Sequence, residues 1–166
     1  MIRLILGGEK SGKSAVAYGL FRQAPGPGVV LAMGRARDPA FRAQILAHRL
    51  ERDPLTPVRE PGLELPQALE EAARQGRNVL VDSLDFWLFA CMEAGQNLSD
   101  ALVESLGAFG QGPQCVLVSC EVGLGPIAPT AQVRRFARAQ GALNQALAAV
   151  AGDVRLVVAG VSLHLK

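Results

Sequence analysis

The stretch Gly7-Gly8-Glu9-Lys10-Ser11-Gly12-Lys13-Ser14 decides how the rest of this chain is interpreted. It satisfies the pattern G-x-x-x-x-G-K-[S/T], in which a glycine-rich turn leads from a strand into a helix. The apolar run Ile2–Leu6 before it predicts a buried strand, and a helix is expected from about Lys13 to Arg22 after it. This setting favours a phosphate-binding loop over a chance glycine turn.

The backbone and the side chains of this loop are expected to bind different parts of the nucleotide's phosphates and their metal ion. Backbone N–H groups of the turn would surround phosphate oxygens, and the start of the following helix adds partial positive charge. Lys13 would reach the outer phosphates as the catalytic cation, and the Ser14 hydroxyl would bind Mg²⁺. The predicted nucleotide-binding residues of the loop are Gly7, Gly8, Glu9, Lys10, Ser11, Gly12, Lys13 and Ser14.

A second candidate metal ligand, Asp82, stands at the end of the apolar run Val79–Val81. A carboxylate at a strand end beside a phosphate loop can hold Mg²⁺, so Asp82 is predicted to join Ser14 at the nucleotide. The alternative is that Asp82 caps the helix that starts near Leu84. Asp85 is expected to be an ordinary residue of that helix's first turn.

Apolar runs alternate with helical segments along the chain. Strands are predicted at Ile2–Leu6, Val29–Met33, Asn78–Asp82, Gln114–Ser119, Val154–Ala159 and Val161–Leu165. Helices are predicted at about 13–22, 39–52, 65–75, 84–93, 99–109 and 131–149, with Ser99 as a candidate N-cap and a loop around Pro54, Pro57 and Pro61. The order predicts one α/β domain over residues 1–166, a RecA-like P-loop NTPase sheet that is mostly parallel, with helices on both faces and a short antiparallel C-terminal extension.

Composition and charge argue against several other classes of protein. The chain has 166 residues, of which 49% are hydrophobic and 19% charged, so it can bury the core of one domain. Its formal net charge of +2 is too small for a protein dedicated to nucleic acid, and no apolar run is long enough for a membrane span. Three cysteines without a CxxC spacing favour the reducing cytoplasm over a disulfide framework or a zinc site.

Several other segments form an ordered series that narrows the function. They are Ile45–His48, Val81–Leu84, Ser119–Gly125, Arg134–Phe136, Gly141–Gln145, Val157–Val161 and Lys166. Together with the loop, they resemble the bifunctional adenosylcobinamide kinase/adenosylcobinamide-phosphate guanylyltransferase family of cobalamin biosynthesis over residues 2–166. The resemblance implies that ATP or GTP phosphorylates adenosylcobinamide, that GTP then donates GMP to adenosylcobinamide phosphate, and that the enzyme is a homotrimer.

The resemblance also implies that GMP passes through a covalent intermediate on His48. A neutral imidazole can attack the α-phosphorus near pH 7 and form a phosphoramidate. Arg52 follows one helical turn later and would neutralise phosphate charge. Judged by residue type alone, His48 is also typical of an ordinary histidine on a surface helix.

Three further charged residues match family positions. By resemblance, Glu60 would approach the guanosine end of the nucleotide, and Glu121, which follows the fourth predicted strand, would lie at the nucleotide site. Arg134 matches a basic position of the long helix. The alternatives are that Glu121 pairs with a nearby arginine and that Arg134 lies on a solvated helix face.

Some positions depart from the family pattern, among them Ala40, Gln44, Ala90, Cys120 and Ala137. They spare the phosphate loop and fall at positions where the family handles the base, the corrinoid substrate or the subunit contacts. This leads to the hypothesis that guanylyl transfer is kept while the kinase step is weak or altered. Cys120 is predicted to be a small strand-end residue and not a reactive thiol. Two other functions stay open: a degenerate relative that binds GTP for regulation, and a small-molecule P-loop kinase without guanylyl transfer.

Overall fold

The structure, a computed structural model, describes residues 1–33, 56–125 and 130–166. The predicted helix over residues 39–52 lies outside these residues, and so do His48 and Arg52. In chain order the elements are β1 (Ile2–Gly7), α1 (Lys13–Gln23), β2 (Gly28–Ala32), β3 (Val58–Arg59), η1 (Gly62–Glu64), α3 (Leu65–Arg74), β4 (Asn78–Asp82), α4 (Leu84–Glu93), α5 (Ser99–Ser105), η2 (Leu106–Phe109), β5 (Cys115–Cys120), α6 (Ala131–Val150), β6 (Asp153–Val158) and β7 (Val161–His164).

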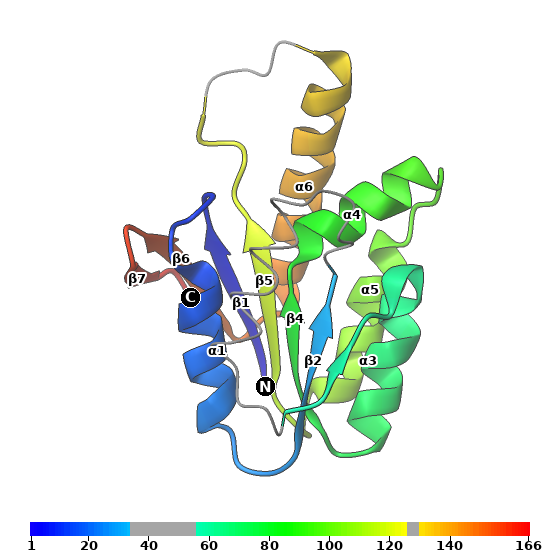
Figure 1. The fold of residues 1–166 in the computed structure, drawn as a ribbon, viewed down its shortest axis with the longest axis vertical. Coiled ribbons are helices and arrows are strands. Elements are labelled where there is room, and N and C mark those ends of the chain that lie inside the picture. The colour runs from blue at the N-terminus through cyan, green and yellow to red at the C-terminus, as the bar shows by residue number, and fades with distance from the viewer. Residues whose placement is uncertain (34–55, 126–129) are drawn as a thin grey trace.

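The described strands form one sheet in the order β3-β2-β4-β5-β1-β6-β7 (Figure 1). Neighbouring strands from β3 to β6 are parallel, whereas β7 pairs antiparallel with β6. The six predicted strands and the antiparallel C-terminal extension are confirmed. Because β1 lies between β5 and β6, the loop that follows it opens near the middle of the carboxyl edge of the sheet, where parallel α/β sheets bind ligands.

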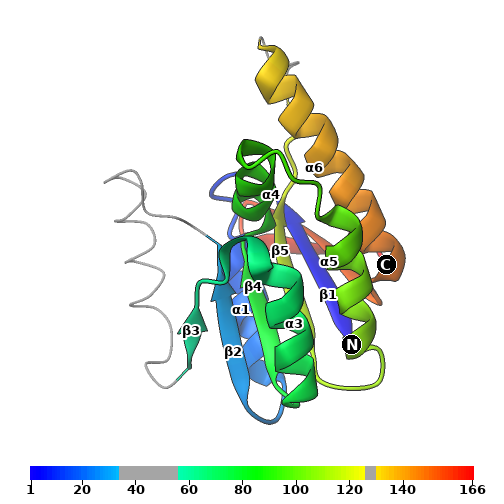
Figure 2. The ribbon, with the colours of Figure 1, turned by 90° about the vertical axis from the view of Figure 1, so that its right-hand side faces the viewer.

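Helices cover both faces of this sheet, as predicted (Figures 1 and 2). On one face, Ala17 and Phe21 of α1 pack against strand residues such as Ile5 and Val118. On the other face, α3, α4, α5 and α6 bury the larger apolar cluster, in which Trp87 and Phe109 are fully buried. Side chains of β1, β2, β4 and β5 alternate between these two clusters, which explains why these strands are near-continuous apolar runs.

The predicted loop around Pro57 and Pro61 is wrong in part, because β3 forms between the two prolines. Val58 and Arg59 pair in parallel with Val30 and Leu31 of β2. The Val30 N–H donates to the Pro57 carbonyl at 2.9 Å. Proline lacks an N–H but keeps its carbonyl, so a two-residue strand at the sheet edge is compatible with flanking prolines.

The prediction that Ser99 caps a helix is also wrong. Ser99 is the first residue of α5, and the N-cap position falls on Leu98, which makes no side-chain capping bond. Asn97 takes part of that role, since its side-chain oxygen accepts the Ser99 N–H at 3.3 Å. An Asn side chain two residues upstream offers the same acceptor as a serine cap would.

The long helix α6 has 20 residues and begins with a capping bond from the Val133 N–H to the Thr130 hydroxyl. Its buried residues Gln140, Leu143, Asn144 and Leu147 recur at helical spacing and face the sheet. Figure 1 shows its amino-terminal half extending past the carboxyl edge of the sheet. Within the three described ranges, none of the helices has both the length and the apolar character that crossing a membrane requires.

Candidate nucleotide site

The loop after β1 turns directly into α1, which confirms the predicted strand–turn–helix setting. Gly12 is the N-cap of α1, and its carbonyl accepts the Val16 N–H at 3.2 Å. The Gly8 carbonyl accepts both the Ser11 N–H at 3.3 Å and the Lys13 ammonium at 3.1 Å. These bonds close the turn and hold the Lys13 cation against it.

The inside of the turn has little space, yet it contains a hydroxyl group without a partner. A Cβ on Gly7 would lie 2.8 Å from the Val157 carbonyl oxygen, so no larger residue fits there. The Ser11 Oγ beside Gly7 is buried and has no hydrogen-bond partner among the described residues. Because a buried hydroxyl without a partner is costly, the turn suits a ligand that accepts a hydrogen bond, such as a phosphate oxygen.

Ser14 and Asp82 meet at the carboxyl ends of β1 and β4. The Ser14 hydroxyl donates to Asp82 Oδ1 at 3.1 Å. Ser83 occupies the N-cap position of α4, so the alternative role of Asp82 as the helix cap is wrong. Hydroxyl and carboxylate oxygens are the ligands that Mg²⁺ takes in phosphate sites, where it keeps several waters, so this pair fits the donor set of Mg²⁺.

Asp85 lies closer to this site than its sequence position suggested. It is in the first turn of α4, as predicted, and its carboxylate accepts a hydrogen bond from the Ser83 hydroxyl. Burial raises the pKa of Asp85, and the charge of Asp82 adds to that effect, whereas the Ser83 bond and the charge of Lys13 oppose it. The charges of Lys13 and Asp82 therefore both reach Asp85. The signal in the sequence is an acidic residue that follows shortly after the strand-end acid Asp82.

The end of β5 lies between the end of β4 and the phosphate loop, because β5 pairs with both β4 and β1. The Glu121 N–H donates to the Gly7 carbonyl at 3.0 Å, and the Glu121 carboxylate accepts the Gly123 N–H at 3.0 Å. Cys120 before it is 9% exposed, and burial, together with the charge of Asp85, raises the pKa of its thiol. Cys120 is therefore a buried strand-end residue without the features of a reactive thiol, as predicted.

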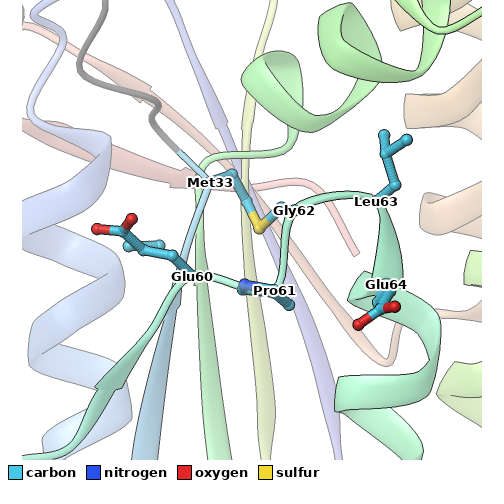
Figure 3. Close-up of a pocket in the computed structure, with 7 residues that line it drawn as sticks. Met33, Glu60, Pro61, Gly62, Leu63 and Glu64 are labelled. Carbon is cyan, nitrogen blue, oxygen red and sulfur yellow. The ribbon is translucent and has the colours of Figure 1, made fainter.

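Glu60 lies at the far end of the same edge of the sheet, in a separate cavity. Its lining includes Met33 after β2, Glu60 and Pro61 after β3, and Glu64, around about 450 Å³. Figure 3 shows the Glu60 and Glu64 carboxylates on opposite sides of Met33 and Pro61. The Met33 N–H donates to the Asp82 carbonyl at 3.0 Å, so this cavity adjoins the strand that carries the predicted metal ligand.

A buried polar network, which the sequence did not indicate, ties α6 to the end of β5. Ser119 donates to Asn144 Oδ1 at 2.6 Å, and Gln140 donates to the Ser119 hydroxyl at 2.7 Å. Asn144 in turn donates to the Cys120 carbonyl at 3.1 Å. The network fixes the backbone from which Glu121 projects. Its only trace in the sequence is the spacing of Gln140 and Asn144 on one helix face.

Comparison with known proteins identifies the family. The family described as cobinamide kinase / cobinamide phosphate guanyltransferase, CobU, matches residues 3–165. The chain belongs to this family. Among members of the CobU family, it is 34% identical to the bifunctional adenosylcobalamin biosynthesis protein CobP of Pseudomonas aeruginosa, over 98% of this chain and 96% of that protein. It is 29% identical to the bifunctional adenosylcobalamin biosynthesis protein CobU of Escherichia coli, over the full length of both.

Among solved structures, this CobU-family chain is similar to the P4 protein of bacteriophage phi6 in complex with ADP. The sequence identity is 18% and the TM-score 0.49, over 97% of this chain. The chain spans about half of that structure, 52% of its length. The CobU-family assignment therefore rests on the sequence comparisons.

Proposed function

We propose that this chain phosphorylates adenosylcobinamide with ATP or GTP and then transfers GMP from GTP to the phosphate formed. The observation that carries the proposal is the Ser14–Asp82 pair, 3.1 Å apart and next to the phosphate loop, in a chain of the CobU family. The names of the relatives from Pseudomonas aeruginosa and Escherichia coli, which are bifunctional adenosylcobalamin biosynthesis proteins, support a chain with both activities.

In the kinase step, the hydroxyl oxygen of adenosylcobinamide attacks the γ-phosphorus of the nucleotide. The bond to the bridging oxygen breaks, a nucleoside diphosphate leaves, and the hydroxyl releases its proton. Lys13 and the backbone N–H groups of the loop bind the phosphate oxygens and stabilise the developing charge. Ser14 and Asp82 would hold Mg²⁺, which when bound supplies further neutralisation of the phosphates.

In the transfer step, an imidazole nitrogen of His48 attacks the α-phosphorus of GTP and pyrophosphate leaves. A phosphate oxygen of adenosylcobinamide phosphate then attacks the same phosphorus, which releases His48 and forms adenosylcobinamide-GDP. Arg52 would neutralise phosphate charge during both displacements. Glu60 would lie toward the guanosine end, and Glu121 would contact the nucleotide from the end of β5.

Covalent labelling tests the transfer step directly. The protein is incubated with Mg²⁺ and GTP labelled on the α-phosphate, denatured, and examined for retained label. We expect label that is labile to acid and stable to alkali, as a phosphoramidate is, and that is absent from His48→Ala. The matched control is His164→Ala, which removes the other histidine of the chain, an exposed residue of β7, and should label normally.

The same experiment separates the alternative functions. A protein that binds GTP but never retains label would be a regulatory GTP-binding relative or a kinase without guanylyl transfer. Steady-state rates with adenosylcobinamide then distinguish these two. They also test the hypothesis of a weak kinase, because phosphorylation as fast as guanylyl transfer contradicts it. Of the departures behind that hypothesis, Ala90 and Ala137 lie on α4 and α6 and leave the loop intact.

We further propose that residues 1–166 work as one catalytic domain within a homotrimer in the cytoplasm. The family resemblance supports the homotrimer. The three cysteines without a CxxC spacing support a reducing compartment such as the cytoplasm. Sedimentation analysis of the purified protein tests the trimer: a mass near three chains is expected, and a monomer that retains both activities would contradict it.

A further inference from the structure

The turn between β6 and β7 touches the phosphate loop although almost the whole chain separates them. The Gly160 N–H donates to the Ser11 carbonyl at 2.8 Å. On the β1 side of the turn, Val157 pairs with Gly7 in the sheet register. The segment Val157–Val161 was one of those that carried the family resemblance, yet neither proposed reaction assigns it a role.

The two backbones also fit each other sterically. Gly12 has a φ of 93°, and a Cβ there would lie 3.2 Å from the Gly160 Cα. Gly160 has a φ of 81°, and Ala159 before it has a φ of 51°, both in the left-handed region. The close approach thus requires an unusual backbone on each side of the contact.

Packing does not explain the shape of this turn. Ala159 and Gly160 are exposed, and a Cβ on Gly160 would have nothing within 4 Å. A side chain at position 160 would therefore point into open space, so glycine is needed there for its backbone conformation. What that conformation achieves is the bond from the Gly160 N–H to the carbonyl of Ser11, whose own hydroxyl is the unpartnered group inside the loop.

We propose that Gly160 is a positioning residue for the nucleotide: the β6–β7 turn holds the Ser11 carbonyl outward and so keeps the N–H groups of the loop directed at phosphate. This inference rests on the proposed role of the loop in nucleotide binding. Gly160 acts through Ser11 and Gly12 and touches no reacting atom. Its effect belongs to nucleotide affinity and not to turnover at saturating nucleotide.

Three variants of the full chain test this role. Gly160→Val places a β-branched residue where φ is positive, so the turn must shift away from Ser11. Gly160→Asn is the conservative rescue, because asparagine tolerates the left-handed region. Gly76→Val is the matched control: Gly76 has a φ of 66° and open space at its Cβ, but it precedes β4 at the opposite edge of the sheet.

Two measurements are made on each variant: the affinity for a fluorescent methylanthraniloyl derivative of GTP with Mg²⁺, and amide hydrogen exchange of residues 8–13. For Gly160→Val we expect the affinity for the nucleotide to fall about five-fold, the equivalent of one net hydrogen bond. The rate of amide hydrogen exchange at residues 8–13 should increase. Gly160→Asn and Gly76→Val should match the parent in both. The kinase kcat at saturating nucleotide should stay within about two-fold of the parent, since the chemistry is untouched.

Unchanged affinity and exchange in Gly160→Val would overturn the inference, and so would an equal loss in Gly76→Val, which would reflect general destabilisation. A parent protein without measurable affinity for the nucleotide contradicts the proposed function instead. In that case the exchange of residues 8–13 still decides whether the turn supports the loop.

Discussion

Asp82 offers a direct test at the scale of single residues, because its carboxylate already contacts the Ser14 hydroxyl. Asp82→Asn keeps the size of the side chain but removes the negative charge with which Asp82 would bind the proposed Mg²⁺. We expect kinase turnover to fall about 100-fold or more, since charge stabilisation at the transferring phosphate is lost. The measurement is the phosphorylation rate across a MgCl₂ titration, which should also shift to higher concentration.

Asp100→Asn is the matched control, because Asp100 is exposed in the first turn of α5. Its phosphorylation rate and its dependence on MgCl₂ concentration should match those of the parent protein. Ser14→Ala combined with Asp82→Asn should reduce the phosphorylation rate by much less than the two single changes would together, if both residues hold the one Mg²⁺ ion proposed for this site. Additive losses would argue that the two side chains act separately and that the pair is not a metal site.

Several site residues could be predicted from spacing alone, because a phosphate loop is a local motif. Lys13 and Ser14 belong to one continuous stretch, and Asp82 is identified by its place after an apolar strand. The proximity of Asp85 to the site was not predicted, since it depends on the direction in which α4 leaves the sheet. Glu121 was indicated by its place after the fourth predicted strand as well as by family resemblance, whereas Glu60 came from the resemblance alone, because no local pattern distinguishes it from other acids.

At the scale of elements, the polar network between α6 and β5 is expected to contribute to the free energy of unfolding. Asn144→Leu removes the donor to the Cys120 carbonyl and the acceptor for Ser119, and both groups stay buried. We expect the free energy of unfolding to fall by about 1–3 kcal/mol, the cost of buried polar groups left without partners. Urea unfolding followed by circular dichroism measures it.

Gln145→Leu provides the comparison, because Gln145 is the next residue of α6 and is exposed. Its unfolding free energy should stay within about 0.5 kcal/mol of the parent, as for most surface substitutions. If Asn144→Leu were as stable as Gln145→Leu, the network would not be what holds α6 against the end of β5.

Some helices and strands could be predicted from sequence patterns alone, and others could not. Long apolar strands such as β1 and β5 are predictable because both of their faces are buried. β3 was missed because its two residues are exposed and lie between prolines, and only pairing with β2 makes them a strand. Ser99 was misplaced because α5 already begins at Ser99, so that the N-cap position falls on Leu98 and the Asn97 side chain accepts the Ser99 N–H.

At the scale of the whole molecule, nucleotide binding should stabilise the fold, since the loop exists only in the native state. With GTP and Mg²⁺ at about 100 times the dissociation constant, linkage predicts about 2.7 kcal/mol of stabilisation, or roughly 5–10 °C in Tm for a domain of this size. Thermal unfolding monitored by circular dichroism gives the shift.

Chelation of Mg²⁺ should reduce this shift in Tm, and Lys13→Ala should remove most of it while leaving the Tm of the free protein nearly unchanged. Lys13 is a suitable probe because its ammonium bonds the Gly8 carbonyl at the surface and supports no part of the core. A rise in Tm that persists in Lys13→Ala would mean that GTP binds elsewhere on the molecule.

The strand order also determines when a growing chain can acquire its site. The phosphate loop is synthesised before β5 and β6, yet β1, which leads into the loop, pairs with both of these later strands. The Gly160 N–H that bonds the Ser11 carbonyl follows later still, in the turn after β6. A ribosome-bound chain therefore carries the motif long before β5, β6 and the β6–β7 turn emerge to complete the nucleotide site.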